Sequence, residues 1–484
     1  MKIKLQNLTQ HIILIFPVLL MCLLTICSRW VTDYISMPVI ITKLATIAIY
    51  APFLCFVLWK FFGDLRKPEK SLLNLTFYVF SAYYAALFVF RFFTGAEIKE
   101  NLYYTAIFLG SLALFMLIAN NNIKITAEGI SIKILLFSSV LLLYYFAYFI
   151  FIKRILYSCP INEIALGGTL ILLLPVISAV ISKFNNKKMW LICSTAIIAG
   201  IVLTIMTLGS RAVFAFMCIA IIAIVLININ NKKLVICVIT GAVIGIIITA
   251  ILFAFNIGSV RTAVYRETNL SSLAGFIDNI AEENTTITEE STTAEESTTA
   301  EESSTAEVPA TEATSFAEDT TNSEETSVIE QENSTSAPIN SMVDNQIAKS
   351  DSMRSELFKL SIEEVKKNIL FGTGNVFYEH EYGGSSGKVN APVHNILLAT
   401  LNCYGLLGLI LIAAIIVLIC IKFRIFNFRA GKIQFKLTLL VLFALYFGIS
   451  MIQATGYDTL VMPVFFIGLG VFWKLSDDCI LMKE

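Results

Sequence analysis

The stretch Leu234–Asn256, LVICVITGAVIGIIITAILFAFN, is 23 residues long and contains no charged side chain. In an α-helix, about 20 residues at roughly 1.5 Å rise per residue cross the hydrocarbon core of a bilayer. The stretch therefore predicts a transmembrane helix. Small residues let neighbouring helix backbones approach closely, so Gly241 and Gly245 are expected to allow helix packing.

The same criterion identifies eleven further apolar runs and predicts twelve spans in total. They cover 11–28, 39–59, 72–92, 102–119, 134–152, 163–182, 189–208, 212–229, 234–256, 394–421, 436–455 and 459–474. The first run is interpreted as a retained helix, because no small-residue cleavage site of a signal peptide follows it. The predicted fold class is an all-α, polytopic integral membrane protein.

The composition of the 484-residue chain agrees with this class. Hydrophobic residues make up 57% and charged residues 15%, whereas about 25% is typical of soluble chains. A cytosolic globular enzyme and a disordered protein are therefore excluded. The ten cysteines lack the paired spacing of a metal site, and most lie in apolar runs, where they act as small hydrophobic residues.

The distribution of Lys and Arg predicts the orientation. With the N-terminus inside, cytoplasmic loops and ends hold 20 of the 35 basic residues, and the short external loops and ends hold seven. Basic residues are enriched on the cytoplasmic side of membrane proteins. We therefore expect both termini in the cytoplasm. Residues 1–256 would contain spans one to nine, 257–393 an external loop, and 394–484 the last three spans and a cytoplasmic tail.

The centre of this loop is acidic and repetitive. Residues 282–332 contain 16 acidic side chains and no Lys, Arg or His, and EESTTA occurs at 289–294 and again at 295–300. Such a segment lacks the apolar content needed to offset chain entropy, so 281–335 is interpreted as a disordered tether. A neutral repeat expansion is favoured over a glycosylated stalk or an acidic shield that repels anionic polymers.

Deletion of residues 281–335 is therefore expected to leave activity largely intact. A membrane-insertion assay and a glycan-transfer assay on the deleted protein would check this expectation. Loss of activity in a normally inserted protein would contradict the tether interpretation.

The segment after the tether predicts an amphipathic helix over 354–369, which lies at the membrane surface or packs on the external ends of the spans. Phe358, Ile362, Val365 and Ile369 follow helical spacing, and charged residues occupy the other face. The helix would end at Leu370–Gly374, LFGTG, where Gly372 and Gly374 permit either a tight turn or the close approach of a ligand.

Three ionisable residues lie where predicted helices begin at the external membrane boundary: Arg211, Arg354 and His394. A guanidinium binds phosphate oxygens bidentately, and exposed N–H groups at a helix N-terminus favour an anion. A neutral imidazole accepts a proton from a hydroxyl nucleophile. Arg211 is equally compatible with an interfacial arginine that reaches the lipid headgroups, and His394 with a polar residue that hydrogen-bonds Asn395.

His380 lies between Glu379 and Glu381, but three adjacent side chains do not converge on one ion, so no metal site is expected. The predicted spans also lack the acidic residues within the membrane that mark an ion pathway. No nucleotide-binding loop, nucleic-acid site or cofactor is expected.

The sequence resembles the O-antigen ligase and O-antigen polymerase superfamily between about 195 and 415. The motifs that carry the resemblance are Leu208-Gly209-Ser210-Arg211, a helix beginning at Arg354, Leu370–Gly374, and His394-Asn395 followed by Gly405-Leu406-Leu407-Gly408. The resemblance implies a GT-C-like membrane glycosyltransferase of polysaccharide and cell-envelope biosynthesis.

The resemblance also implies a reaction. Such enzymes transfer glycan from undecaprenyl pyrophosphate onto an acceptor, without a metal, at the outer face of the membrane. By this analogy Arg211 and Arg354 hold the pyrophosphate, and His394 deprotonates the hydroxyl of an acceptor glycan. The expected partners are the lipid-linked donor, a glycan or lipid-linked glycan acceptor, membrane lipids, and the flippase or chain-length machinery.

The acidic insertion departs from the family pattern, so Arg261 and Arg266, just after span nine, are alternatives to Arg354 for the second phosphate contact. A flippase or exporter of lipid-linked oligosaccharide is the main alternative function. The repeat symmetry or charged spans of a transporter are not found in the sequence. A membrane anchor that displays the acidic segment is a third hypothesis, although twelve spans exceed what an anchor needs.

Overall fold

The computed structural model describes residues 72–94, 99–119, 126–147, 163–255, 260, 355–381, 388–425, 433–453, 456–458 and 460–480. The predicted spans 11–28 and 39–59 and the tether 281–335 lie outside these residues, as do Arg261, Arg266 and Arg354.

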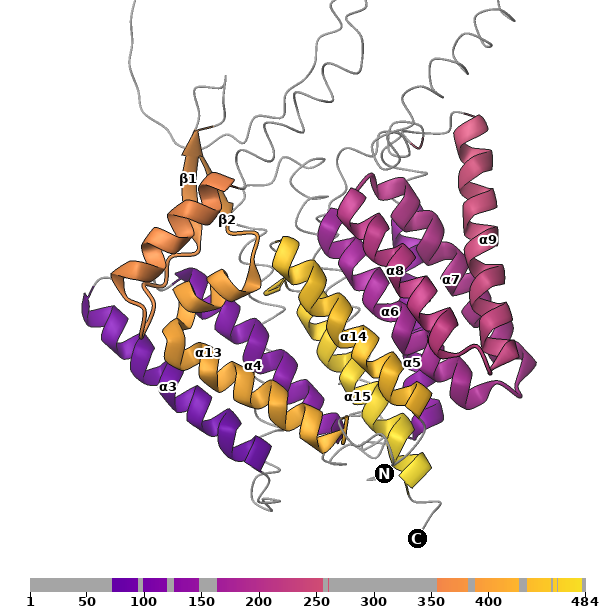
Figure 1. The fold of residues 1–484 in the computed structure, drawn as a ribbon, viewed down its shortest axis with the longest axis horizontal. Coiled ribbons are helices and arrows are strands. Elements are labelled where there is room, and N and C mark those ends of the chain that lie inside the picture. Colours follow the sequence, from indigo (N-terminus) through magenta and orange to yellow (C-terminus); the bar gives the residue numbers. More distant parts are fainter. Residues whose placement is uncertain are drawn as a thin grey trace, which may run out of the picture. The chain divides into compact units, whose positions relative to one another are not determined.

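The described residues form helices and one β-hairpin (Figure 1). The helices before the long loop are α3 (Leu72–Thr94), α4 (Lys99–Ala119), α5 (Ala127–Ala147), α6 (Glu163–Phe184), α7 (Lys188–Leu208), α8 (Arg211–Ile227) and α9 (Lys232–Ala254). After it come a helix over 355–367, strands β1 (Phe377–Glu381) and β2 (Lys388–Pro392), and helices α13 (Ile396–Lys422), α14 (Ile433–Ile452) and α15 (Val461–Ile480).

These elements define a polytopic membrane protein. Six helices, α3, α6, α7, α9, α13 and α14, are long and apolar enough to cross a bilayer. The number of twelve spans remains a prediction. Most helix bounds lie within a few residues of the predicted ones, but α5 begins at Ala127, seven residues before the predicted start at Ile134. Its first turn carries Glu128, a residue that the apolar criterion excludes but a helix end accommodates.

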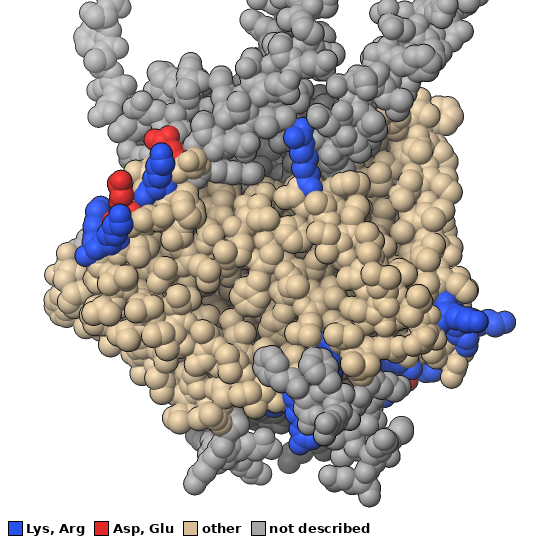
Figure 2. All heavy atoms as spheres, in the orientation of Figure 1, with Lys and Arg blue, Asp and Glu red and all other residues tan. Residues whose placement is uncertain are grey.

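The surface has the charge distribution of a membrane protein. In the view of Figure 2, Lys and Arg lie at the margins of the described surface, and a broad uncharged belt separates them. Large apolar side chains within the helices are exposed, among them Ile236, Val243 and Ile247 of α9. Such exposure stabilises a protein in lipid and is unfavourable in water.

Helix α6 is the most enclosed of the six spans, with 94% of its most apolar window buried. It packs against α7, α8, α14 and α15, while α7 packs against α9 and α3 against α13. As expected from the sequence, Gly241 and Gly245 allow α9 to approach α7: a Cβ atom would lie 2.9 Å from the Thr195 carbonyl oxygen at Gly241 and 2.7 Å from that of Ala199 at Gly245.

The amphipathic segment forms a helix over 355–367, close to the predicted 354–369, but it buries a different face. Leu357 and Ser361 are buried, whereas Phe358 is 45% and Ile369 54% exposed. The side of the helix with Leu357 and Ser361 packs on the protein, and Ser361 accepts a hydrogen bond there from a buried amide of α13. Exposed Phe358 and Ile369 are compatible with the predicted position at the membrane surface, which remains a prediction.

A β-hairpin that the sequence analysis missed follows this helix. Strands β1 and β2 pair antiparallel, with Phe377 opposite Pro392 and Glu381 opposite Lys388. The hairpin leads directly into α13, so it determines where that helix begins. We call the end of the helices at which α13 begins the hairpin end (Figure 1).

Candidate functional site

The junction between α7 and α8 places Arg211 at a helix start. Gly209 ends α7 in the left-handed conformation, with φ 69° and ψ 22°, and Ser210 is extended before α8 begins at Arg211. The Ser210 side chain makes no capping hydrogen bond to the first turn. Arg211 is exposed. Backbone N–H groups and a guanidinium at one helix start form an environment suited to an anion.

His394 directly precedes α13, and its neighbours fix the backbone on both sides. The Val393 N–H donates to the Val376 carbonyl oxygen at 3.3 Å. Asn395 caps the helix, because its Oδ1 accepts hydrogen bonds from Leu397 N at 2.9 Å and Leu398 N at 3.1 Å. Asn395 therefore provides the side-chain cap of α13. His394 is half-buried at the end of this ordered segment.

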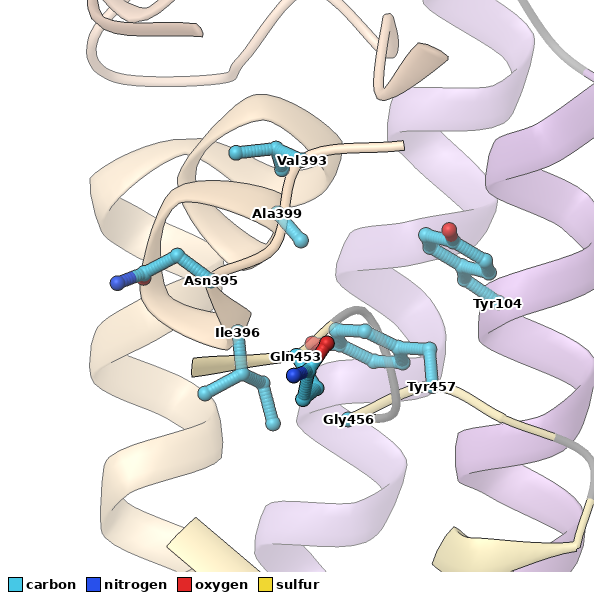
Figure 3. Close-up of a pocket in the computed structure, with 8 residues that line it drawn as sticks. All are labelled: Tyr104, Val393, Asn395, Ile396, Ala399, Gln453, Gly456 and Tyr457. Carbon is cyan, nitrogen blue, oxygen red and sulfur yellow. The ribbon is translucent and has the colours of Figure 1, made fainter. Parts of the chain in front are cut away.

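A small pocket lies beside the start of α13 (Figure 3). Val393, Asn395, Ile396 and Ala399 line one side of it. The other lining residues are Tyr104 of α4 and three from the end of α14 and the segment that follows: Gln453, Gly456 and Tyr457. The pocket has room for about one water molecule. His394 follows one lining residue and precedes another.

Helix α13 is broken at Gly405, which has φ 65° and ψ −172°. Only glycine adopts this backbone region readily. The turn that ends helix 355–367 fills the break: Leu406 N donates to the Ile369 carbonyl oxygen at 2.8 Å, and Leu407 N to that of Leu370 at 3.3 Å. The break therefore makes α13 two half-helices, with the turn packed between them.

Gly372, in the turn, lies as close to the backbone of α13 as Gly405 of α13 lies to the turn. Its φ is 67°, and a Cβ atom there would collide with the carbonyl oxygens of Leu401 and Asn402. Gly374, with φ 92°, donates its N–H to the Asn402 carbonyl oxygen at 2.8 Å. Of the two roles predicted for these glycines, the structure contains the tight turn, and the group that approaches them closely is the backbone of α13.

Side chains of α3 satisfy the other carbonyl groups at the break. Arg91, only 3% exposed, donates from one guanidinium nitrogen to the carbonyl oxygens of Cys403 at 2.8 Å and Phe371 at 3.0 Å. Tyr83 donates to the Tyr404 carbonyl oxygen at 2.5 Å. A broken helix is tolerated in a membrane only where such partners replace the lost helical hydrogen bonds.

A buried amide connects the first half-helix to the segments before it. Asn402 Nδ2 donates to Ser361 Oγ at 2.7 Å and to Tyr378 Oη at 2.8 Å. Tyr378 in turn donates to the Asn375 carbonyl oxygen at 3.3 Å. Burial raises the pKa of Tyr378 to about 12, so the phenol keeps its proton at neutral pH. Helix 355–367, the hairpin and the His394 segment are thus one hydrogen-bonded unit.

A series of contacts at the hairpin end connects the start of α13, next to His394, with the start of α8 at Arg211. Asn395 Nδ2 donates to the Met451 carbonyl oxygen of α14 at 3.4 Å. Gly168 of α6 lies against Ile449 of α14, and the adjacent Gly167 lies against Val213, two residues after Arg211. The structure therefore brings the starts of α8 and α13 to the same end of the helices, with α6 and α14 between them.

Sequence reasoning missed Arg91, Gln453 and Tyr457. In the sequence, Arg91 is one of the seven basic residues assigned to the short external loops and ends, and no other role was predicted for it. A signal was available, because an arginine inside an apolar run generally requires buried partners. The pocket residues gave no signal, since neutral residues at helix ends are common and only the fold brings these together.

The family model of O-antigen ligase matches residues 195–413, a region that begins in α7 and ends in α13. It contains Gly209, Arg211, the turn with Gly372 and Gly374, His394 and Gly405. The match confirms the predicted resemblance to the O-antigen ligase and polymerase superfamily. At a general level it indicates a membrane glycosyltransferase of polysaccharide biosynthesis. No match was found among curated proteins or among solved structures.

Proposed function

We propose that this protein transfers or polymerises glycan from an undecaprenyl-pyrophosphate-linked donor onto a sugar hydroxyl at the outer face of the bacterial plasma membrane. The observation that carries the proposal is the family match over 195–413, whose region includes both His394 and Arg211. The location of these two residues at the same end of the helices supports a shared site.

The proposed reaction is a single displacement. His394 accepts the proton of the acceptor hydroxyl, whose oxygen forms a bond to the anomeric carbon of the donor sugar. The bond between that carbon and the pyrophosphate oxygen breaks, so undecaprenyl pyrophosphate leaves with the bonding electrons. One displacement inverts the anomeric configuration, and no metal takes part.

Guanidinium groups would stabilise the leaving group, which gains negative charge in the transition state. Arg211 lies at the start of α8, where the backbone N–H groups also favour an anion. Arg354, with Arg261 and Arg266 as alternatives, is the proposed second contact. All three arginines lie outside the described residues, so their assignment depends on the sequence motif alone.

A transfer assay tests this proposal. The full-length protein is reconstituted in proteoliposomes with a lipid-linked repeat unit isolated from the source cells. Longer carrier-linked glycan would identify a polymerase, and glycan on a different acceptor, with release of the carrier pyrophosphate, would identify a ligase. Movement of the donor across proteoliposomes without a new glycosidic bond would contradict the proposal and favour a flippase.

Substitution Arg211→Lys is expected to lower transfer at least tenfold while the protein inserts normally. Lysine keeps the positive charge but loses the planar fork that holds two phosphate oxygens together. The measurement is the initial rate of transfer, with Lys188→Arg at the opposite end of α7 as a control that should keep the wild-type rate. A wild-type rate for Arg211→Lys would contradict bidentate phosphate binding.

A further inference from the structure

Gln453, one of the residues that line the pocket beside His394, has a buried amide oxygen. The residue is 3% exposed, and among the residues that the structure describes its Oε1 has no hydrogen-bond donor. A buried polar atom without a hydrogen-bond partner is unfavourable, and a ligand group that enters the adjacent pocket is one way to satisfy it.

The backbone around Gln453 keeps this side chain in place. Its N–H donates to the Ile449 carbonyl oxygen at 2.8 Å, which continues the hydrogen bonding of α14 by one residue. After it, Gly456 fits against Ile396 so closely that a Cβ atom would lie 2.5 Å from the Ile396 side chain. The Gly456 carbonyl oxygen accepts a hydrogen bond from Tyr446 Oη at 2.7 Å. Gln453 therefore belongs to a rigid wall of the pocket.

Another part of the lining is aromatic and also fixed. Tyr104 and Tyr457 stack with ring centroids 4.9 Å apart and an interplanar angle of 8°. Tyr457 Oη and Thr400 Oγ1 share a hydrogen bond of 2.8 Å, so its hydroxyl already has a partner. Figure 3 shows the two tyrosines and Gln453 around the pocket, with the start of α13 beside them.

The size and charge of the pocket define the group that it accepts. The eight described residues that line it include no charged side chain, so it does not suit the pyrophosphate of the donor. It has room for about one water-sized group. A sugar hydroxyl is neutral, has this size and donates the hydrogen bond that Gln453 Oε1 lacks.

We infer that this pocket binds one hydroxyl of the acceptor sugar, and that Gln453 is a specificity-determining residue that accepts its hydrogen bond. The inference depends on the proposed function, because it assigns the acceptor of the same reaction. The bound hydroxyl is distinct from the attacking one, which reaches His394 beside the pocket. Binding of the first hydroxyl would therefore orient the second.

The test compares Gln453→Met with the wild-type protein in the reconstituted transfer assay. Methionine has a similar length but lacks the amide oxygen, so the KM for the acceptor is expected to rise about three- to tenfold, the effect of one hydrogen bond. The kcat at saturating acceptor should change less than twofold. Gln434→Met, at the opposite end of α14, is the matched control and should leave both constants unchanged.

Two outcomes would overturn the inference. One is an unchanged acceptor KM in Gln453→Met, and the other is a fall in kcat without a rise in KM, which would indicate a structural role only. If Gln453→Met is not inserted, Gln453→Asn, which retracts the amide by one methylene, must meet the same KM criterion. Absence of transfer in the wild-type protein would instead refute the proposed function, so the two failures are distinguishable.

Discussion

Replacement of His394 by alanine is expected to reduce glycan transfer by about 10²–10⁴-fold, the usual contribution of a general base. Without the imidazole, the acceptor hydroxyl loses the group that takes its proton. The backbone conformation should persist, because the cap of α13 is formed by Asn395 and the preceding strand is bonded through Val393. The measurement is the initial rate in the reconstituted assay, together with the protein level in the membrane.

His380→Ala is the matched control, since it removes an imidazole from β1 of the same hairpin. We expect this variant to retain activity, as no catalytic or metal-binding role is assigned to His380. Retained transfer by His394→Ala would eliminate His394 as the base. A lost activity that returns when imidazole is added to the assay would give further support.

Replacement of Gly405 by alanine is expected to cause the largest loss of stability. Its backbone, with φ 65° and ψ −172°, lies in a region that costs other residues about 1–3 kcal/mol. A Cβ atom would also collide with the backbone of Leu370 and Phe371, and overpacking of this kind costs a similar amount again. Thermal unfolding in detergent should show the destabilisation, and transfer should be lost with it.

Gly168→Ala offers a matched control for this effect. A Cβ atom at Gly168 would lie 3.5 Å from Val461, an ordinary van der Waals distance, and the glycine is inside a helix where alanine is favoured. Its stability should therefore match or exceed that of the wild-type protein. A Gly405→Ala protein with unchanged thermal stability would show that the turn does not need to enter the break in α13.

The sequence contained enough information for the helices but not for the contacts between them. Apolar runs identify spans such as 234–256 because lipid imposes one simple requirement on every residue of a span. The positions of Arg211 and His394 at helix starts were also predictable, since they follow from the ends of those runs. Arg354 was predicted by its motif position alone, and it remains a prediction.

The rest depends on long-range pairing. The break at Gly405 occurs within an unbroken apolar run, 394–421, and nothing in that run indicates that residues 369 and 370 complete its hydrogen bonds. Likewise, Ser361 is an unremarkable polar residue in the sequence, and its burial follows only from Asn402, 41 positions later. Periodicity describes one element at a time, so it did not identify the side of helix 355–367 that packs on α13.

The connection between the turn at 369–374 and α13 also determines where the chain can tolerate insertions. This turn lies after the acidic repeats in the sequence. We therefore expect that additional or missing repeats before residue 355 leave its contacts with α13 unchanged. An insertion between 375 and 393 would instead act directly on the segment that positions His394. We therefore expect a change in repeat number to affect glycan transfer less than a change in the length of the short hairpin does.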